Sequence, residues 1–464
     1  MKTRILTLLT VIFFTINSSG QIRLPSVIGD NMVLQQNSEV SVWGWGEPGN
    51  EIKVTGSWNN DTVKAKADNH SFWSVKLKTP SAGGPYTINL KSGGELTLKN
   101  IMIGEVWICS GQSNMEWSAR HNLMNAEEEI KNANYPDIRL FHVKKLASNT
   151  PQENCFARWE ECTPESMSTF SSVGYFFARN LNQKLNIPIG IIEVAWGGTP
   201  AEVWIREDLV NADPLLKSCA GRLTKYDWWP NEPGVTYNSM IAPLIPFNIA
   251  GAIWYQGEGN AVTPESYRKL MGTLIQNWRA DFGKDFPFYF VQIAPFAYGN
   301  ESKAPIIREM QMQTAGDIQK TGMVVVSDLV DDIKNIHPAN KQDVGRRLAN
   351  WALGENYGVQ GQPYRHPEYE SMKIEKSKVR ITFRNVPGGL ITRSEKIDCF
   401  EIAGADRKFV SATVKIDGKT VIVSAKDVKT PEAVRFSFSN DAIGNLFSTE
   451  GLPVAPFRTD KWEY

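Results

Sequence analysis

The chain has 464 residues, which is more than one hydrophobic core usually organises and indicates two or three domains. Hydrophobic residues make up 42% and charged residues 22%, a composition that excludes an intrinsically disordered chain. Basic and acidic residues number 50 each, and this balance disfavours nucleic acid or another polyanion as a partner.

Residues 1–20 have the pattern of a secretory signal peptide. Lys2 and Arg4 form a basic start, an apolar run covers 5–16, and small residues precede a cleavage point. The apolar run is shorter than the about 20 residues that cross a bilayer, so it predicts a removed signal and no membrane span. We therefore expect an exported protein, periplasmic or extracellular.

The five cysteines of an exported chain cannot all pair with one another. Cys155 and Cys162 are close enough in sequence to bridge a short loop, which an oxidising compartment permits. Whether they pair stays open at this point. No CxxC pair or Cys/His cluster has the spacing of a zinc site, and we expect neither a metal nor another cofactor.

Residues 21–100 predict a small N-terminal β-sandwich domain. Short runs such as VSVWGWG, EIKVTGSW and SFWSVKL alternate apolar and polar residues, and Gly, Asn and Asp separate them. A similar texture returns near the end of the chain, in KVRITFRNV, CFEIAG and TVIVSA. Residues 370–464 therefore predict a second small β domain.

Residues 101–360 predict an α/β domain. The apolar runs EVWIC, IGIIEVAW, IAGAIWYQ, FYFVQIAPF and GMVVVSDL read as buried strands. Amphipathic segments between or after them predict helices, among them 168–185, 264–282, 305–318 and 339–354. Buried strands that alternate with helices indicate a parallel sheet covered on both faces.

Polar residues follow four of these strands. They are Ser113 after the first, residues 196–199 after the second, residues 256–260 after the third, and Asp328, Asp331, Asp332 and His337 after the last. Because ligands gather at the carboxyl ends of strands in such a sheet, we expect these residues to share one edge.

This set of residues is typical of acyl transfer. A serine becomes a useful nucleophile only when a base takes its proton, and the oxyanion then needs hydrogen-bond donors. His337 is the histidine on a strand-closing loop of the α/β region, whereas the other four lie in or near the β regions or in less regular stretches. Each feature alone is more often structural, and the hypothesis depends on their combination.

Five segments resemble the sialate O-acetylesterases, which are SGNH-type carbohydrate esterases. They are GQSNMEW, AWGGTPAEVW, WYQGEGNA, the Asp-rich loop ending in IHP, and the tail FEIAGADRKFV…GLPVAPFRTD. The resemblance covers essentially the whole chain after the signal. It implies a flavodoxin-like, three-layer hydrolase domain with a parallel sheet, flanked by the two β-sandwich-like domains.

The resemblance also implies roles for individual residues. Ser113 matches the nucleophile and His337 the general base. The backbone N–H groups of Ser113 and of Gly197 (or Gly198), with the side chain of Asn260, match the oxyanion positions.

The acid that orients His337 is left open by the sequence. Lys334 stands where this fold usually has an aspartate, and the chain reads Asn-Ile-His where many relatives read Asp-Ile-His. Glu258, Asp332 and a backbone carbonyl are the candidates. We expect Glu258, because the strand before it ends on the same edge.

The expected function is hydrolysis of O-acetyl groups from carbohydrates, foremost from sialic acids, by a metal-free serine esterase. The carboxylate of a sialic acid requires a cation, and Arg308 near a helix start is the candidate, with a surface salt bridge as its other reading. Gln112 and Gln256 are expected to contact the substrate.

Three other readings stay open: an acetylesterase acting on xylan or pectin, a carbohydrate-binding protein without activity, and a metal-dependent hydrolase that uses the acidic loop with His337. For the protein itself we expect a monomer or a small homo-oligomer.

Overall fold

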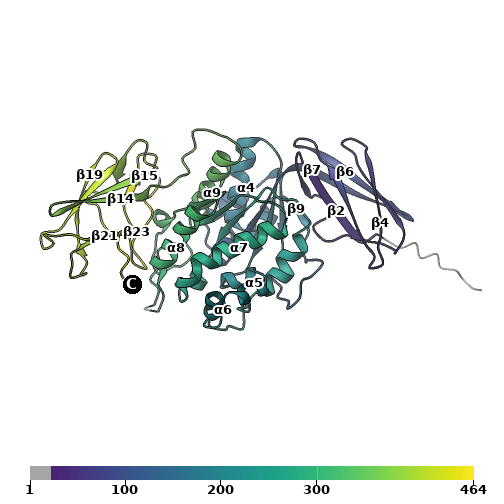
Figure 1. Cartoon of the computed structure of the whole chain (residues 1–464). Coiled ribbons are helices and arrows are strands. Elements are labelled where there is room, and N and C mark those ends of the chain that lie inside the picture. Colours follow the sequence, from purple (N-terminus) through teal and green to yellow (C-terminus); the bar gives the residue numbers. More distant parts are fainter. Residues whose placement is uncertain (1–21, 300, 464) are drawn as a thin grey trace, which may run out of the picture.

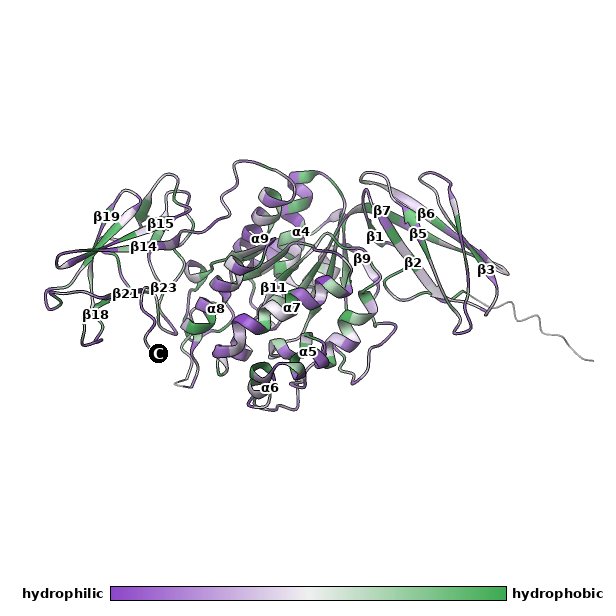
Figure 2. Cartoon of the chain, viewed as in Figure 1, coloured by the Kyte–Doolittle hydropathy of each residue, from purple (hydrophilic) through white to green (hydrophobic). Residues whose placement is uncertain are grey.

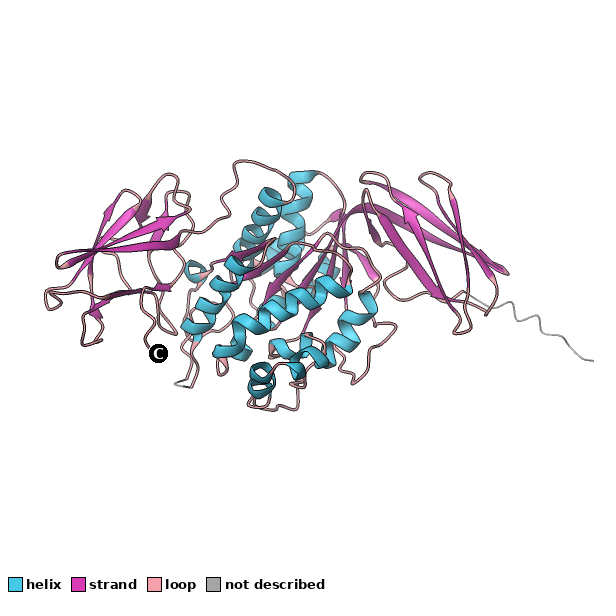
Figure 3. Ribbon diagram, in the orientation of Figure 1, coloured by secondary structure: helices cyan, strands magenta, loops and turns pink. Residues whose placement is uncertain are grey.

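The computed structural model describes residues 22–299 and 301–463 (Figure 1). The expected signal peptide, residues 1–20, lies outside the described residues. A helix-rich α/β region occupies the middle of the molecule, and a β region lies at each end (Figures 1 and 3). Within the described ranges, no helix is both long and apolar enough to cross a membrane.

The middle region contains a mixed sheet with the strand order β13-β12-β11-β7-β10-β8-β9. Its strands are β7 (Gly94–Gly111), β8 (Tyr135–His142), β9 (Trp159–Cys162), β10 (Ile189–Ala195), β11 (Gly251–Tyr255), β12 (Phe288–Val291) and β13 (Thr321–Val324). Neighbours pair in parallel except β9, which is antiparallel to β8. The expected α/β fold is confirmed, with one antiparallel edge strand added to the parallel sheet.

Both faces of this sheet are covered, which explains why its strands read as continuous apolar runs. On β7, Trp107 and Cys109 face one core, whereas Val106 and Ile108 face the other. This alternation follows from the two-residue period of a strand. Figure 2 shows the resulting concentration of hydrophobic residues on the central strands.

The helices lie on the two sides of the sheet. They are α1 (Ser113–Glu116), α2 (Ala126–Lys131), α3 (Pro164–Thr169), α4 (Ser172–Leu185), α5 (Glu207–Ala212), α6 (Pro214–Ala220), α7 (Tyr267–Asp281), α8 (Ala304–Asp317) and α9 (Lys341–Glu355). Helices α4 and α9 pack on each other over one core, and α7 and α8 lie together over the other. The helix expected over 168–185 begins only at Ser172, because Ser171 caps it by accepting from the Gly174 N–H.

The N-terminal β region contains β1 (Val33–Gln35), β2 (Glu39–Trp45), β3 (Glu51–Gly56), β4 (Thr62–Lys66), β5 (Phe72–Lys78) and β6 (Gly83–Ser92). The first half of β7 pairs with β6, and its second half lies at the centre of the α/β sheet. The boundary expected at residue 100 therefore falls inside one strand.

The C-terminal β region has its own hydrophobic core, built around residues such as Val379, Ile381 and Phe436. Its strands are β14 (Glu368–Glu375), β15 (Lys378–Arg384), β16 (Leu390–Thr392), β17 (Phe400–Ala403), β18 (Val410–Ser411), β19 (Thr413–Asp417), β20 (Thr420–Ser424), β21 (Ala433–Phe436), β22 (Leu446–Ser448) and β23 (Phe457–Arg458). They form two four-stranded sheets and one two-stranded sheet.

The thiols of Cys155 and Cys162 are buried and free, so the structure does not join them in a disulfide. Burial raises the pKa of each thiol to about 12, which keeps both in the protonated, unreactive form.

Gly111 ends β7 in a position that excludes any side chain. Its φ is 136°, and a Cβ there would collide with the carbonyl of Tyr255 on the neighbouring strand β11. The same carbonyl accepts the N–H of Gln112 at 3.0 Å. This close approach fixes the turn from which Ser113 projects.

We predict that Gly111→Ala lowers the free energy of unfolding by at least about 2 kcal/mol, because the backbone strain and the collision add. Chemical denaturation followed by circular dichroism measures the change. Gly94→Ala in the same strand is the control, since nothing lies within 4 Å of a Cβ at that position. Equal stability of the two variants would contradict the argument.

Candidate active site

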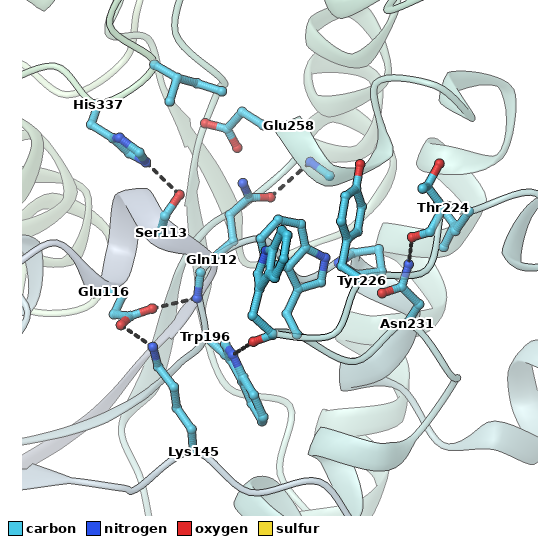
Figure 4. Close-up of a pocket in the computed structure, with 18 of the residues that line it drawn as sticks. Gln112, Ser113, Glu116, Lys145, Trp196, Thr224, Tyr226, Asn231, Glu258 and His337 are labelled. Carbon is cyan, nitrogen blue, oxygen red and sulfur yellow. Dashed lines mark hydrogen bonds and ion pairs between the residues drawn. The ribbon is translucent and has the colours of Figure 1, made fainter.

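Ser113 and His337 lie together at the carboxyl edge of the sheet (Figure 4). Ser113 is the first residue of α1, directly after the turn that ends β7, and His337 follows β13. The Oγ of Ser113 lies 2.9 Å from the Nε2 of His337. This distance allows the serine hydroxyl to donate its proton to the imidazole.

The imidazole of His337 is stacked and partly desolvated. The ring of Trp117 lies parallel to it, with 3.9 Å between centroids and 16° between planes. Burial lowers the pKa of His337 to about 4, with smaller contributions from the charges of Lys341 and His121. The ring is therefore neutral near pH 7 and able to accept a proton.

Neither expected carboxylate contacts His337. The Glu258 carboxylate instead accepts from the Asn114 side chain at 2.7 Å. Asp332 is exposed and accepts from the backbone N–H of Lys334 at 2.9 Å. The structure therefore does not show Glu258 orienting His337. The strand before Glu258 ends at the expected edge of the sheet, but the Glu258 side chain is hydrogen-bonded to Asn114.

Asn114 is a residue that the sequence analysis missed. Its Nδ2 donates to Glu258 and, at 3.0 Å, to the carbonyl of Ile336, which directly precedes His337. Its Oδ1 accepts from Lys341 Nζ at 2.6 Å. One buried amide therefore connects the helix that bears Ser113 to the loop that bears His337.

The charges on this network are strongly perturbed by burial. Burial raises the pKa of Glu258 and lowers the pKa of Lys341 to about 7, whereas the attraction between the two opposes both shifts. Asn114 lies between them as donor to one and acceptor from the other, so no direct ion pair is needed.

Gly197 lies beside Ser113, where a Cβ on the glycine would stand 3.3 Å from the Ser113 Cβ. Its N–H donates to Glu116 Oε2 at 2.5 Å. The other oxygen of Glu116 pairs with Lys145. A backbone donor thus lies near the serine, and in this structure a carboxylate accepts from it.

Asn260 and Gln256 do not reach the serine. Asn260 Nδ2 donates to Glu202 at 2.9 Å, and its Oδ1 accepts from Gln256 Nε2 at 2.8 Å. Gln256 Oε1 accepts from Tyr267, also at 2.9 Å. Both side chains are buried in a network beneath the edge, and the expected oxyanion role of Asn260 and substrate contact of Gln256 stay predictions.

Of the other two residues expected to contact the substrate, Gln112 lines the cleft and Arg308 does not. Gln112 lines the cleft, but its Oε1 accepts from the backbone N–H of Gly259 at 3.1 Å, which holds the loop after β11 in place. Arg308 is 1% exposed and donates to the carbonyls of Ser439 and Asn440. It attaches α8 to the C-terminal β region, so its expected contact with a substrate carboxylate is corrected.

The acidic loop before His337 does not assemble as one site. Asp328 forms two hydrogen bonds with Arg347, each at 2.7 Å, and Asp331 and Asp332 are exposed. Across the residues that the structure describes, no group of three or more His, Cys, Asp or Glu side chains is arranged to hold a metal.

A cleft of about 600 Å³ opens in front of Ser113 and His337. Its far wall is aromatic and comes from the loop at residues 222–234, with Trp196 beside it (Figure 4). The side chains of Tyr226, Trp228 and Trp229 contact one another there, and we call these three the aromatic platform. The sequence analysis missed it, although the WW pair at 228–229 was a visible signal.

Comparison with known proteins identifies the family. Residues 103–354 match the family model described as carbohydrate esterase, sialic acid-specific acetylesterase. The chain belongs to this family. It is therefore a carboxylic ester hydrolase, and the expected resemblance is confirmed.

Two relatives span most of the chain. Sialate O-acetylesterase of Homo sapiens is 30% identical over 407 residues, which are 78% of this chain and 76% of the relative. The crystal structure of a carbohydrate acetylesterase from Xanthomonas citri has a TM-score of 0.87 and 35% identity, and it covers 95% of this chain and 100% of its own. The similarity includes the flanking β regions as well as the α/β sheet.

We predict that the loss of kcat/KM caused by protonation of His337 has its midpoint near the His337 pKa of about 4 and not between pH 6 and 8. Below that value the imidazole is protonated and cannot accept the Ser113 proton. The measurement is acetate release across pH, with circular dichroism at each pH to confirm folding. A midpoint near the ordinary value of about 6.5 would show that the ring is not desolvated.

Because His337 is the expected acceptor of the Ser113 proton, we predict that His337→Ala lowers kcat by at least about a thousandfold. His70→Ala is the matched control and should leave kcat unchanged, since His70 is exposed in the N-terminal β region.

We predict that Glu258→Gln lowers kcat by less than about tenfold, because glutamine keeps an oxygen that can accept from Asn114. Glu258→Ala should cost more, since it leaves a buried amide donor unpaired. Asp332→Asn, on an exposed turn, should change kcat by less than about twofold. Steady-state kinetics of the three variants tests this order. A loss near 10⁴ in Glu258→Gln would instead mean that the carboxylate sets the His337 tautomer.

Proposed function

We propose that this esterase removes O-acetyl groups from carbohydrates, foremost from sialic acids, through an acetyl-enzyme on Ser113. The observation that carries the proposal is the 2.9 Å contact between Ser113 Oγ and His337 Nε2 at the mouth of the cleft. A carbohydrate-binding protein without activity has no use for a neutral, stacked imidazole on a serine hydroxyl.

In the proposed reaction, His337 takes the Ser113 proton while Oγ attacks the acetyl carbonyl. The tetrahedral oxyanion accepts from the N–H groups of Ser113 and Gly197, and Glu116 gives up its hydrogen bond to Gly197 at this step. The oxyanion collapses, the sugar oxygen leaves with the proton from His337, and water then hydrolyses the acetyl ester with His337 again as base.

The pair works without a carboxylate in this proposal. The Trp117 ring restricts the imidazole plane by stacking, and the Asn114 bond to the Ile336 carbonyl positions the backbone that carries it. A serine–histidine dyad of this kind lacks the stabilisation that an acid gives to the imidazolium.

The finer assignment of the fold is part of the proposal. A serine after β7, near the start of the α/β region, and a histidine after β13, near its end, support the SGNH-type arrangement. We propose the domain division 21–100, 101–360 and 370–464, with β7 as the strand shared across the first boundary. The pattern of residues 1–20 supports export.

The names of the curated relatives favour sialic acids as substrates. In the cleft, Lys145 is the side chain suited to meet the carboxylate of such a sugar. Lys145 is already paired with Glu116, however, and this neutral pair favours uncharged acetylated sugars, such as those of xylan, as the second candidate.

The function is tested by measuring acetate release from O-acetylated sialosides, acetylated xylan and acetylated pectin. We expect the highest kcat/KM on the sialosides. Release from xylan alone would select the second candidate, and no release from any of the three would overturn the proposal.

We predict that Ser113→Ala lowers kcat on the best of these substrates by at least about a thousandfold, because the serine oxygen forms the covalent intermediate. Thermal unfolding should show that the variant keeps its fold. A variant with more than about a tenth of the wild-type kcat would refute Ser113 as the nucleophile.

A further inference from the structure

The aromatic platform is unusual in its exposure. Trp228 is 65% exposed and Tyr226 44%, and their ring centroids lie 5.8 Å apart. Large aromatic side chains normally bury most of their surface, and neighbouring exposed ones mark a place where something binds. The mechanism proposed above gives these two side chains no role.

Two contacts hold the loop that carries the platform. The side chain of Asn231 donates to the carbonyl of Thr224, which closes the loop on itself. Trp229 packs against Gly198, whose φ of 82° and lack of a side chain leave space for the indole. A preformed surface loses little conformational entropy when a ligand binds.

The platform is also fixed relative to the serine. Gly198 directly follows Gly197, which lies beside Ser113, so the packing of Trp229 joins the platform to that turn. Trp196 Nε1 adds a hydrogen bond to the Trp228 carbonyl at 3.3 Å. Tyr226, Trp228, Ser113 and His337 therefore line one continuous cleft (Figure 4).

We propose that Tyr226 and Trp228 form a subsite that stacks the C–H face of a sugar ring next to the acetylated sugar. The preferred substrate is then an acetylated residue within a glycan, and the free acetylated monosaccharide is a poorer one. This inference rests on the proposed function, which identifies the acetyl ester bond that is broken. It adds that the acetylated sugar is part of a larger glycan.

A sugar fits this position better than a protein surface does. The occupant must share the cleft with the acetyl group that reaches Ser113, which a covalently linked neighbouring sugar does. A pyranose has an apolar C–H face for the aromatic rings and hydroxyl groups for polar neighbours, and the cleft supplies polar neighbours in the Glu116–Lys145 pair.

The kinetic test uses Trp228→Ala with two substrates, O-acetylated sialyllactose and glycerol triacetate, which has no sugar ring. We expect the ratio of kcat/KM for the glycan to kcat/KM for the small ester to fall about tenfold, through a higher KM with kcat retained. Trp228→Phe should restore most of the ratio. An unchanged ratio would overturn the subsite.

Phe156→Ala is the matched control, because Phe156 is also 65% exposed and does not line the cleft. It should leave the ratio as in the wild type.

A binding test separates the subsite from the chemistry. In Ser113→Ala protein, calorimetry measures binding of sialyllactose and xylotriose without acetyl groups. We expect one of them to bind, and its Kd to rise about tenfold when Trp228→Ala is added. Binding of neither glycan, or equal Kd in both proteins, would overturn the subsite even if acetate release holds. Absence of acetate release with Trp228-dependent glycan binding would overturn only the proposed function.

Discussion

The site depends on one buried amide. Ser113 and His337 are 224 residues apart in the chain, and their contact of 2.9 Å requires that two separate loops hold a fixed position. Asn114 supplies this constraint by bonding the Ile336 carbonyl, Glu258 and Lys341 at once. Since a buried amide that loses a partner pays the full desolvation cost, the three bonds favour a single arrangement of the loops that follow β7, β11 and β13.

The same burial sets the proton chemistry. A charge inside a protein is costly unless it is compensated, which is why the pKa of Glu258 rises and that of Lys341 falls. His337 responds in the same direction as Lys341, and its ring stays neutral over the ordinary pH range. On the proposed mechanism His337 is a base that is neutral near pH 7, and neither Glu258 nor Asp332 is placed to stabilise its imidazolium. On this mechanism, turnover relies more on the oxyanion donors.

The sequence predicted the order of the regions and the functional residues that come directly after a strand. The β–α/β–β order, the edge on which Ser113 and His337 meet, and the membership of a carbohydrate esterase family were all readable from strand patterns and motifs. The first two features depend on periodicity and on order along the chain, which a sequence displays directly, whereas the family was implied by the resemblance of five segments to known esterases.

Side-chain direction was not readable in the same way. Glu258, Asn260 and Gln256 follow β11 as expected, yet they point to Asn114, Glu202 and Tyr267, because buried polar groups must first satisfy one another. Arg308 is held by the C-terminal β region, whose contact with α8 no local pattern encodes. The aromatic platform lies on a loop, where periodicity carries no signal.

Glu116 connects the catalytic chemistry with the charge of the cleft. In the resting site its carboxylate accepts from Gly197 and is neutralised by Lys145. On the proposed mechanism, the oxyanion of the tetrahedral intermediate replaces that carboxylate oxygen on the same N–H. The displaced Glu116 keeps its negative charge and its partner Lys145, while the charge of the oxyanion is balanced by the His337 imidazolium that forms in the same step. On that mechanism the Gly197 N–H is held by the backbone, and only the Glu116 side chain has to move before this donor can stabilise the oxyanion.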